Sequence, residues 1–171
     1  LEDIQAALRY IRKNAKRLGV DPKQVGVCGG SAGGHLAAYA STFTPDAEKP
    51  AFSILFYPVI TGETWESHQD SFAQLLGKGR SVAEQQYYSL QNRVTPTTPP
   101  ALILLSDDDA EVPTLSSILY YNALKHYGIP AAMHIYPNEG HGWAAKPWCT
   151  CWEKAKPIIK DWLEIQRKNH Q

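Results

Sequence analysis

A serine at the junction of a predicted strand and a predicted helix has the spacing of a catalytic nucleophile. The segment Gly29–Gly33 (G-G-S-A-G) follows the short apolar run Val25–Cys28 and precedes a helical pattern that starts at Leu36. Flanking glycines let strand and helix pass closely, so that the serine hydroxyl stands clear on a sharp turn. The backbone N–H of Ala32, at the helix start, then points toward a developing oxyanion. Ser31 is therefore the candidate nucleophile and Ala32 the candidate oxyanion donor.

A serine hydroxyl needs a neighbouring base to take its proton, and six histidines compete for that role. His141 stands between Gly140 and Gly142 in the loop after the last predicted strand. Its flanking glycines allow the imidazole to reach inward over a crowded site, so His141 is the candidate base. The other five histidines are weaker candidates. His35 is interpreted as a structural helix residue, His134 as a packed strand residue, and His68 is not assigned to an element. His126 lies at a helix end and His170 in the tail.

Three adjacent aspartates follow the third predicted strand and supply candidates for the carboxylate that orients the base. Asp109 is preferred, because the chain must turn back there and Val112-Pro113 can anchor the loop before the next helix. Asp107 and Asp108 are the fallbacks. Glu111 is weaker, since it lies later in the turn toward the helix.

The elements that must position these residues alternate between strands and helices. Such alternation predicts an α/β fold with a parallel sheet and helices on both faces, and reactive groups then gather at the carboxyl ends of the strands. The predicted strands are 25–28, 51–57, 101–105 and 131–136, and the longer helices are 4–18, 36–42, 114–127 and 152–163. Residues 62–100 form a loose excursion, with short helical pieces near 71–76 and 82–88.

The length and composition predict one domain over residues 1–171. Basic and acidic residues number 17 each, so no electrostatic signal for nucleic acid or an anionic membrane is present. No apolar stretch approaches the length of a membrane span. Cys28 is interpreted as a small core hydrophobe, and Cys149 and Cys151 as structural or incidental. We expect neither a metal nor a cofactor.

The chain resembles serine esterases of the α/β-hydrolase superfamily, and more closely bacterial acetylxylan esterases and feruloyl esterase-like proteins. Four segments carry the resemblance: 26–38, 54–60, 98–113 and 134–143. It implies that Ser31 is the nucleophile, Asp109 the acid and His141 the base, in the Ser-Asp-His chain order of that superfamily. Ser106 departs from the pattern, because a glycine often stands at that place.

The resemblance also implies that the sequence supplies only the last four strands of a larger sheet. The early His-Gly-Gly-type loop, which donates a second oxyanion N–H, has no counterpart here. We therefore expect a truncated domain, or a second chain that supplies the missing part. The exposed edge of the nucleophile strand could then pair with a partner chain or with a second copy.

The resemblance implies a serine carboxylic ester hydrolase that acts through an acyl-enzyme on acetyl or aryl esters of carbohydrates. Tyr57 and Trp143 could line the acyl or sugar pocket, although both are equally well interpreted as core aromatics. The alternatives are a serine peptidase of the prolyl-oligopeptidase type and a non-catalytic hydrolase-fold fragment. The compartment cannot be read, since any signal would lie upstream of Leu1.

Overall fold

The computed structural model describes residues 2–63 and 67–169, which form a parallel sheet flanked by helices. Within these residues the sheet has four strands in the order β1-β2-β3-β4, and all neighbours are parallel. The strands are β1 (Val27–Gly30), β2 (Ser53–Phe56), β3 (Ala101–Ser106) and β4 (Ala131–Tyr136). Because the strands are parallel, their carboxyl ends meet at one edge, and the loops that carry chemistry gather there.

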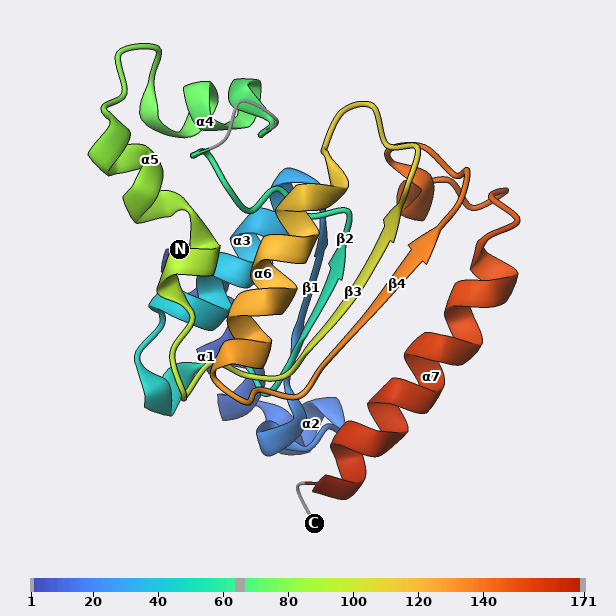
Figure 1. Cartoon of the computed structure of the whole chain (residues 1–171). Coiled ribbons are helices and arrows are strands. Elements are labelled where there is room, and N and C mark those ends of the chain that lie inside the picture. Colours follow the sequence, from blue (N-terminus) through green and yellow to red (C-terminus); the bar gives the residue numbers. More distant parts are fainter. Residues whose placement is uncertain (1, 64–66, 170–171) are drawn as a thin grey trace.

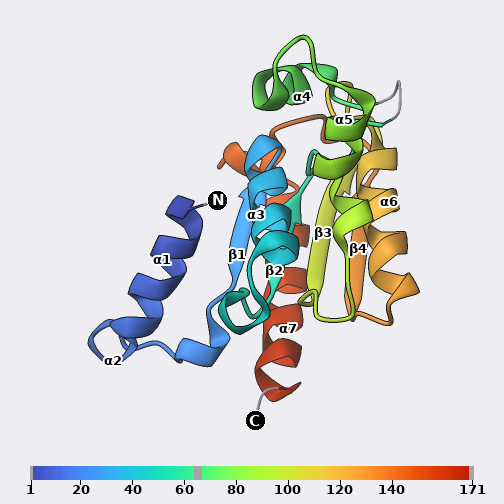
Figure 2. The ribbon, with the colours of Figure 1, turned by 90° about the vertical axis from the view of Figure 1, so that its left-hand side faces the viewer.

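Helices cover both faces of this sheet. Figure 1 shows α3 (Ala32–Phe43) and α6 (Thr114–His126) on one face and α7 (Trp152–Asn169) on the other. Figure 2 shows α1 (Glu2–Lys13) and α2 (Ala15–Leu18) to the side of β1. The predicted α/β class, with a parallel sheet and helices on both faces, is therefore confirmed. The single helix predicted over 4–18 is interrupted at Asn14, which separates α1 from α2.

The excursion between β2 and β3 contains the two predicted short helices, α4 (Gln69–Leu76) and α5 (Val82–Tyr88). The His68 ring accepts a hydrogen bond from the Ser71 backbone N–H and so caps α4, which gives this histidine a structural role. Phe72 of α4 is buried against Val59 and Val112 in a small apolar cluster. Residues 64–66 of the excursion lie outside the described residues. Short 3₁₀ turns complete the chain: η1 (Pro22–Gln24), η2 (Asp46–Glu48), η3 (Leu90–Arg93) and η4 (Trp143–Ala145).

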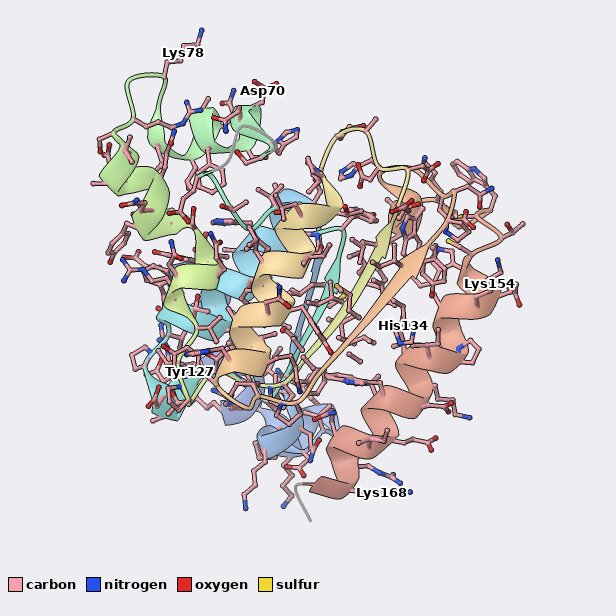
Figure 3. All side chains as sticks on the ribbon, in the orientation of Figure 1. Asp70, Lys78, Tyr127, His134, Lys154 and Lys168 are labelled. Atoms are coloured by element: carbon pink, nitrogen blue, oxygen red, sulfur yellow. The ribbon has the colours of Figure 1, made fainter. Side chains whose placement is uncertain are left out.

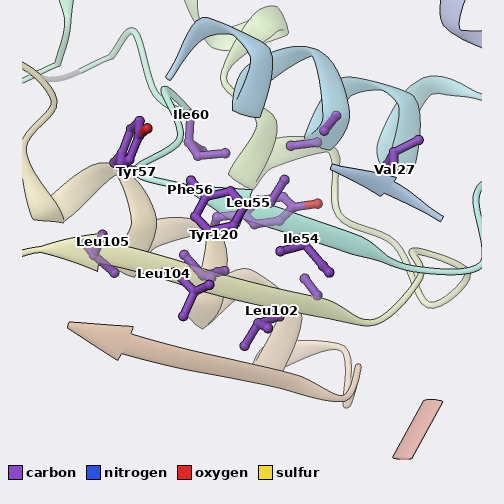
Figure 4. Close-up of a cluster of buried hydrophobic side chains, with 14 of the residues drawn as sticks. Val27, Ile54, Leu55, Phe56, Tyr57, Ile60, Leu102, Leu104, Leu105 and Tyr120 are labelled. Carbon is purple, nitrogen blue, oxygen red and sulfur yellow. The ribbon is translucent and has the colours of Figure 1, made fainter. Parts of the chain in front are cut away.

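The core lies around the two central strands. β2 and β3 are buried along their whole length, as expected for strands of a parallel sheet with helices on both faces. Figure 4 shows Leu55, Leu102 and Leu104 gathered with Tyr120 of α6, and all four side chains are fully buried. The continuous apolar run 101–105 is thus explained by burial on both faces of β3.

The interpretation of Cys28 as a small core residue is wrong, because Cys28 is exposed. A Cβ on its neighbour Gly29 would meet the Gly33 backbone of α3, so strand alternation turns Cys28 to the opposite face. β1 is the edge strand of the described sheet, and Cys28 there lines an open pocket. A short apolar run cannot show by itself that its strand lies at an edge.

Charged side chains project outward around the molecule. Figure 3 shows Asp70, Lys78, Lys154 and Lys168 at its periphery, and all four are exposed. Among the helices of the described residues, none combines the length and apolar character needed to cross a membrane.

Candidate active site

The turn from β1 into α3 presents Ser31 in an unusual backbone conformation. Its φ is 55° and its ψ is −123°, a region that costs energy for a residue with a side chain. Hydrogen bonds fix this geometry on both sides of the residue. The Ser31 N–H donates to the Phe56 carbonyl at 3.0 Å, and the Ser31 carbonyl accepts from the N–H groups of His35 and Val59. Neighbouring strand and helix therefore hold the serine on a sharp turn.

Two glycines permit the close approach of backbones that this turn requires. A Cβ at Gly29 would lie 2.1 Å from the Gly33 carbonyl oxygen, and one at Gly34 would lie 2.8 Å from the Pro58 Cβ. No side chain can be added at either place without moving backbone or proline atoms. The glycines around Ser31 thus differ in purpose, because a Cβ at Gly33 would meet nothing within 4 Å.

Ser31, His141 and Asp109 are brought into one hydrogen-bonded chain from three different loops. The Ser31 Oγ lies 2.9 Å from His141 Nε2, and His141 Nδ1 lies 2.7 Å from Asp109 Oδ2. The Asp109 side chain is 1% exposed and that of His141 12%. With Nδ1 protonated, His141 donates to the carboxylate and leaves Nε2 free to accept the serine proton.

The Asp109 carboxylate is oriented by the turn that follows it. Its Oδ1 accepts from the backbone N–H groups of Glu111 and Val112, both at 2.9 Å. The buried Val112 holds this turn in place. One carboxylate oxygen of Asp109 therefore accepts hydrogen bonds from the loop, and the other oxygen contacts the imidazole of His141.

The fallback residue Asp108 contacts the histidine loop rather than the imidazole. Its Oδ1 accepts from the Ser106 hydroxyl at 2.5 Å and from the Gly140 N–H at 2.8 Å. Ser106 Oγ also accepts from the Glu139 N–H at 2.8 Å. The Ser106 hydroxyl, and then the Gly140 N–H, keep the pKa of Asp108 below its ordinary value. Ser106 and Asp108 thus join the end of β3 to the loop before His141, a role that the sequence pattern does not predict. Its only signal was a serine in place of a frequent glycine.

The other acidic candidates lie farther from the imidazole. Asp107 is exposed, and its backbone N–H donates to the Tyr136 carbonyl at 2.7 Å. The Glu111 Oε2 lies 4.0 Å from His141 Nε2, and this side chain is 65% exposed. Among the acidic candidates, the structure brings Asp109 to Nδ1 of His141.

The Tyr57 side chain packs against the imidazole of His141. Its ring packs against the His141 ring with centroids 4.7 Å apart, and its hydroxyl accepts from the Ala144 N–H at 3.1 Å. Burial raises the pKa of Tyr57, which keeps the hydroxyl neutral. The backbone φ of Tyr57 is 35°, the second positive value at a non-glycine residue in the described chain. Both such residues lie at this site.

The complete burial of Trp143 favours the core interpretation over a place in a pocket wall. Its side chain is fully buried and meets the rings of Phe56, Tyr57, Tyr136 and Trp152. The indole therefore anchors the loop just after His141 without reaching open space.

The turn that carries Ser31, called the elbow from here on, lies between two pockets of about 500 Å³ and 510 Å³. Ser31, His141 and Tyr57 line the first, beside the β1 edge. Ala32 lines the second, the Ala32-side pocket, together with aromatic side chains of α3, α4 and α5: His35, Tyr39, Phe72 and Tyr88. Ala32 is the first residue of α3, and an N–H at that position has no acceptor within its own helix. A negatively charged oxygen at the elbow would find this donor free.

Among the described residues, His141 is the histidine that has a hydrogen bond to the Ser31 hydroxyl. The His35 Nε2 lies 3.1 Å from the Tyr88 carbonyl oxygen, and burial lowers the pKa of this imidazole. His134 lies in β4, and Figure 3 shows it on the side of the sheet toward α7. His126 is in the last turn of α6. His170 lies outside the described residues.

Comparison with known proteins places this chain in a family. The sequence profile of the prolyl oligopeptidase family matches residues 1–157. An acetylxylan esterase from Xylanibacter ruminicola is 37% identical over 166 residues, which are 95% of this chain and 35% of that protein. An endo-1,4-beta-xylanase B from Butyrivibrio fibrisolvens is 37% identical over 153 residues, 83% of this chain and 24% of that protein. The chain thus spans about a third or less of these curated relatives.

Two solved structures share the fold. An acetyl ester-xyloside bifunctional hydrolase from Caldicellulosiruptor lactoaceticus has a TM-score of 0.81 at 32% identity, covering 95% of this chain and 64% of that one. A sugar hydrolase from Lactococcus lactis has a TM-score of 0.83 at 29% identity, covering 99% and 69%. The predicted resemblance to α/β-hydrolase esterases of the acetylxylan esterase group is confirmed. The chain belongs to the prolyl oligopeptidase family of α/β-hydrolases.

Proposed function

We propose that this chain carries the catalytic triad of a serine carboxylic ester hydrolase, with Ser31 as nucleophile, His141 as base and Asp109 as acid. The observation that carries the proposal is the unbroken chain of two short hydrogen bonds, 2.9 Å and 2.7 Å, from the Ser31 hydroxyl through the imidazole to a buried carboxylate. A serine on a strained turn with this arrangement has the geometry of an activated nucleophile.

The proposed reaction begins when the Ser31 Oγ attacks the ester carbonyl carbon and His141 Nε2 takes the hydroxyl proton. The Asp109 carboxylate stabilises the imidazolium through Nδ1. The Ala32 N–H donates to the oxyanion that forms on the carbonyl oxygen. His141 then gives the proton to the leaving alcohol, and an acyl-enzyme remains on Ser31. A water molecule repeats the two steps and releases the acid.

The substrate class rests on the relatives. An acetylxylan esterase and an acetyl ester-xyloside hydrolase are among the proteins that this chain is similar to, so we propose acetyl esters of carbohydrates as substrates. The two pockets on either side of the elbow offer separate places for the acyl group and for the sugar. The aromatic walls of the Ala32-side pocket, formed by Tyr39, Phe72 and Tyr88, suit an apolar or ring-shaped group.

The test is Ser31→Ala, assayed for hydrolysis of p-nitrophenyl acetate and of acetylated xylan. We expect hydrolysis to fall by on the order of 10⁴-fold or more, because the covalent step is lost. Ser81→Ala, at the N-cap of α5 and outside both pockets, is a serine control that should retain turnover within a few-fold. A Ser31→Ala variant with parental activity would refute the mechanism.

A fluorophosphonate probe tests the nucleophile separately from the natural substrate. It reacts with a serine that a neighbouring histidine activates, and we expect it to label Ser31 and to spare the Ser31→Ala protein. Absence of labelling in the folded parent protein would favour the non-catalytic alternative.

A serine peptidase is the second candidate, because the family profile is that of prolyl oligopeptidases and a dipeptidyl aminopeptidase from Pseudoxanthomonas mexicana is 28% identical over 130 residues. Peptidases and esterases of this kind share the triad, so the site alone does not separate them. Cleavage of acetylated xylan and of prolyl peptides should be compared at equal enzyme concentration. We expect the ester to be hydrolysed, and faster turnover of the peptide would reverse the assignment.

A further inference from the structure

A second cluster of reactive side chains lies beside the loop that carries His141, outside the triad. The Cys149 Sγ is 2.8 Å from the Cys151 Sγ and 3.2 Å from the Glu139 Oε2. One ligand atom from each of the three residues lies within 4.8 Å of the others. We propose that Glu139, Cys149 and Cys151 bind a thiophilic divalent cation such as Zn²⁺. This proposal does not rest on the proposed hydrolase function.

The donor set determines the class of cation. Two sulfurs and one carboxylate oxygen are ligands that Zn²⁺ accepts, whereas Mg²⁺ and Ca²⁺ bind oxygen donors. Three protein donors also leave one position of a tetrahedral site for water or another small ligand. The donors come from two segments, the loop after β4 and the turn into α7, so the site closes only in the folded chain.

The geometry requires a small movement of one side chain. Two thiolates at about 2.3 Å from a tetrahedral Zn²⁺ lie about 3.8 Å apart, so the two sulfurs must separate by roughly 1 Å. Cys151 is fully buried and fixed at the start of α7. Cys149 is half-buried in the turn before that helix, so its side chain is the one that can swing outward.

The charges around the sulfurs favour a cation. Burial, and then the contact with Cys149, raise the pKa of Cys151 to about 12. The ionisable side chains that act on its sulfur are Cys149 and Glu139, and neither is a cation. Coordination by both sulfurs as thiolates follows M²⁺ + 2 RSH → M(SR)₂ + 2 H⁺, so the affinity for the cation should rise with pH.

A bound cation would join the histidine loop to the last helix. The Glu139 N–H already donates to the Ser106 hydroxyl, and Glu139 is two residues before His141. Coordination would connect this segment to Cys151 at the start of α7. We therefore expect the cation to raise the thermal unfolding temperature, since all three donors meet in the folded chain and bind the cation more tightly there.

Titration of the reduced protein with Co²⁺ under anaerobic conditions tests the site. We expect sulfur-to-cobalt charge-transfer absorption in the near ultraviolet and visible bands of a tetrahedral complex, both removed by Zn²⁺. Cys149→Ser should weaken Zn²⁺ affinity by at least about tenfold, and Glu139→Gln should weaken it as well. Cys28→Ser is the matched control, because Cys28 lies on β1 and is not among the three donors of the cluster, and the variant should bind as the parent does.

Three outcomes would overturn the proposal. One is the absence of thiolate charge-transfer bands in folded, reduced protein. Another is a Cys149→Ser protein that binds as tightly as the parent, with an unchanged circular dichroism spectrum. The third is loss of two titratable thiols in air together with no Co²⁺ binding after reduction, which would identify a redox-active cysteine pair instead.

Discussion

At the scale of single residues, three adjacent aspartates have three different environments. Asp107 is exposed, Asp108 accepts from the Gly140 N–H, and Asp109 is buried against the imidazole of His141. The difference arises because the turn after β3 points successive side chains in different directions. Substitutions at these neighbouring positions should therefore affect different properties of the protein.

Asp109→Asn tests the proposed acid. The amide keeps the shape of the side chain but removes the charge that stabilises the imidazolium, and it favours the wrong histidine tautomer. We expect kcat for p-nitrophenyl acetate to fall by about 10³–10⁴-fold with a small change in KM. Asp107→Asn is the control and should remain within a few-fold of the parent. Equal effects of the two substitutions would remove Asp109 from the proposed triad.

The lowered pKa of Asp108 predicts that the stability of the folded chain depends on pH. Its pKa in the folded chain is lowered by the Ser106 hydroxyl and the Gly140 N–H. A lowered folded-state pKa adds stability above the unfolded-state value, about 3.9, and this stability is lost as pH falls through the folded-state pKa. Asp108→Asn should therefore reduce the free energy of unfolding at pH 7.

Urea unfolding of the parent and Asp108→Asn between pH 7 and pH 3 measures this effect. The difference between the two proteins should shrink below about pH 4, as Asp108 of the parent becomes protonated. A difference that stays constant over this range would show that the contact does not depend on the carboxylate charge.

At the scale of elements, the packing of β1 against α3 requires Gly29. Its added Cβ would lie 2.1 Å from the Gly33 carbonyl oxygen, which is a backbone atom and cannot rotate away. We expect Gly29→Ala to lower the free energy of unfolding by about 1–3 kcal/mol, because strand and helix must move apart. The Ser31 hydroxyl would move with them, so labelling by a fluorophosphonate should also slow.

Gly33→Ala provides the control within the same helix. A Cβ there meets nothing within 4 Å, and alanine loses less backbone entropy than glycine when a helix forms. Its stability should equal or exceed that of the parent by up to about 1 kcal/mol. Chemical denaturation of Gly29→Ala and Gly33→Ala measures the free energy of unfolding of each variant. Equal destabilisation of the two would contradict the packing argument.

At the scale of the whole molecule, the outer edge of β1 is unpaired within the described residues. Exposed apolar side chains lie on the α1–α2 segment that runs to the side of β1 (Figure 2): Tyr10, Leu18 and Val20, at 57%, 43% and 43% exposure. An open edge next to apolar surface favours pairing with a second copy. We expect the 171-residue chain to associate as its concentration rises.

Light scattering coupled to size-exclusion chromatography measures this association. The double variant Leu18→Lys and Val20→Lys should shift the chain toward the monomer, because charge opposes burial of this surface. Val82→Lys is the control, since Val82 is 70% exposed on the distant α5. A parent chain that stays monomeric at high concentration would contradict the expectation.

The elements themselves were largely predictable from the chain. The strand predicted at 131–136 coincides with β4, and the run 101–105 falls within β3. Boundaries were less predictable where short apolar runs meet glycine: β1 begins at Val27 rather than Val25 and continues to Gly30. The break at Asn14 was not predicted, because the apolar spacing continues through it.

Local patterns along the chain predict the alternation of strands and helices, the serine on its glycine-rich turn, and the preference for His141 and Asp109. They suffice for these features because apolar periodicity and glycine act over a few residues. Four other features become visible in the folded chain: Cys28 is exposed, Trp143 is buried, Asp108 and Ser106 join two loops, and Glu139 lies beside Cys149 and Cys151. Each of these depends on which distant segments meet around the sheet, and the spacing of residues along the chain does not contain that information.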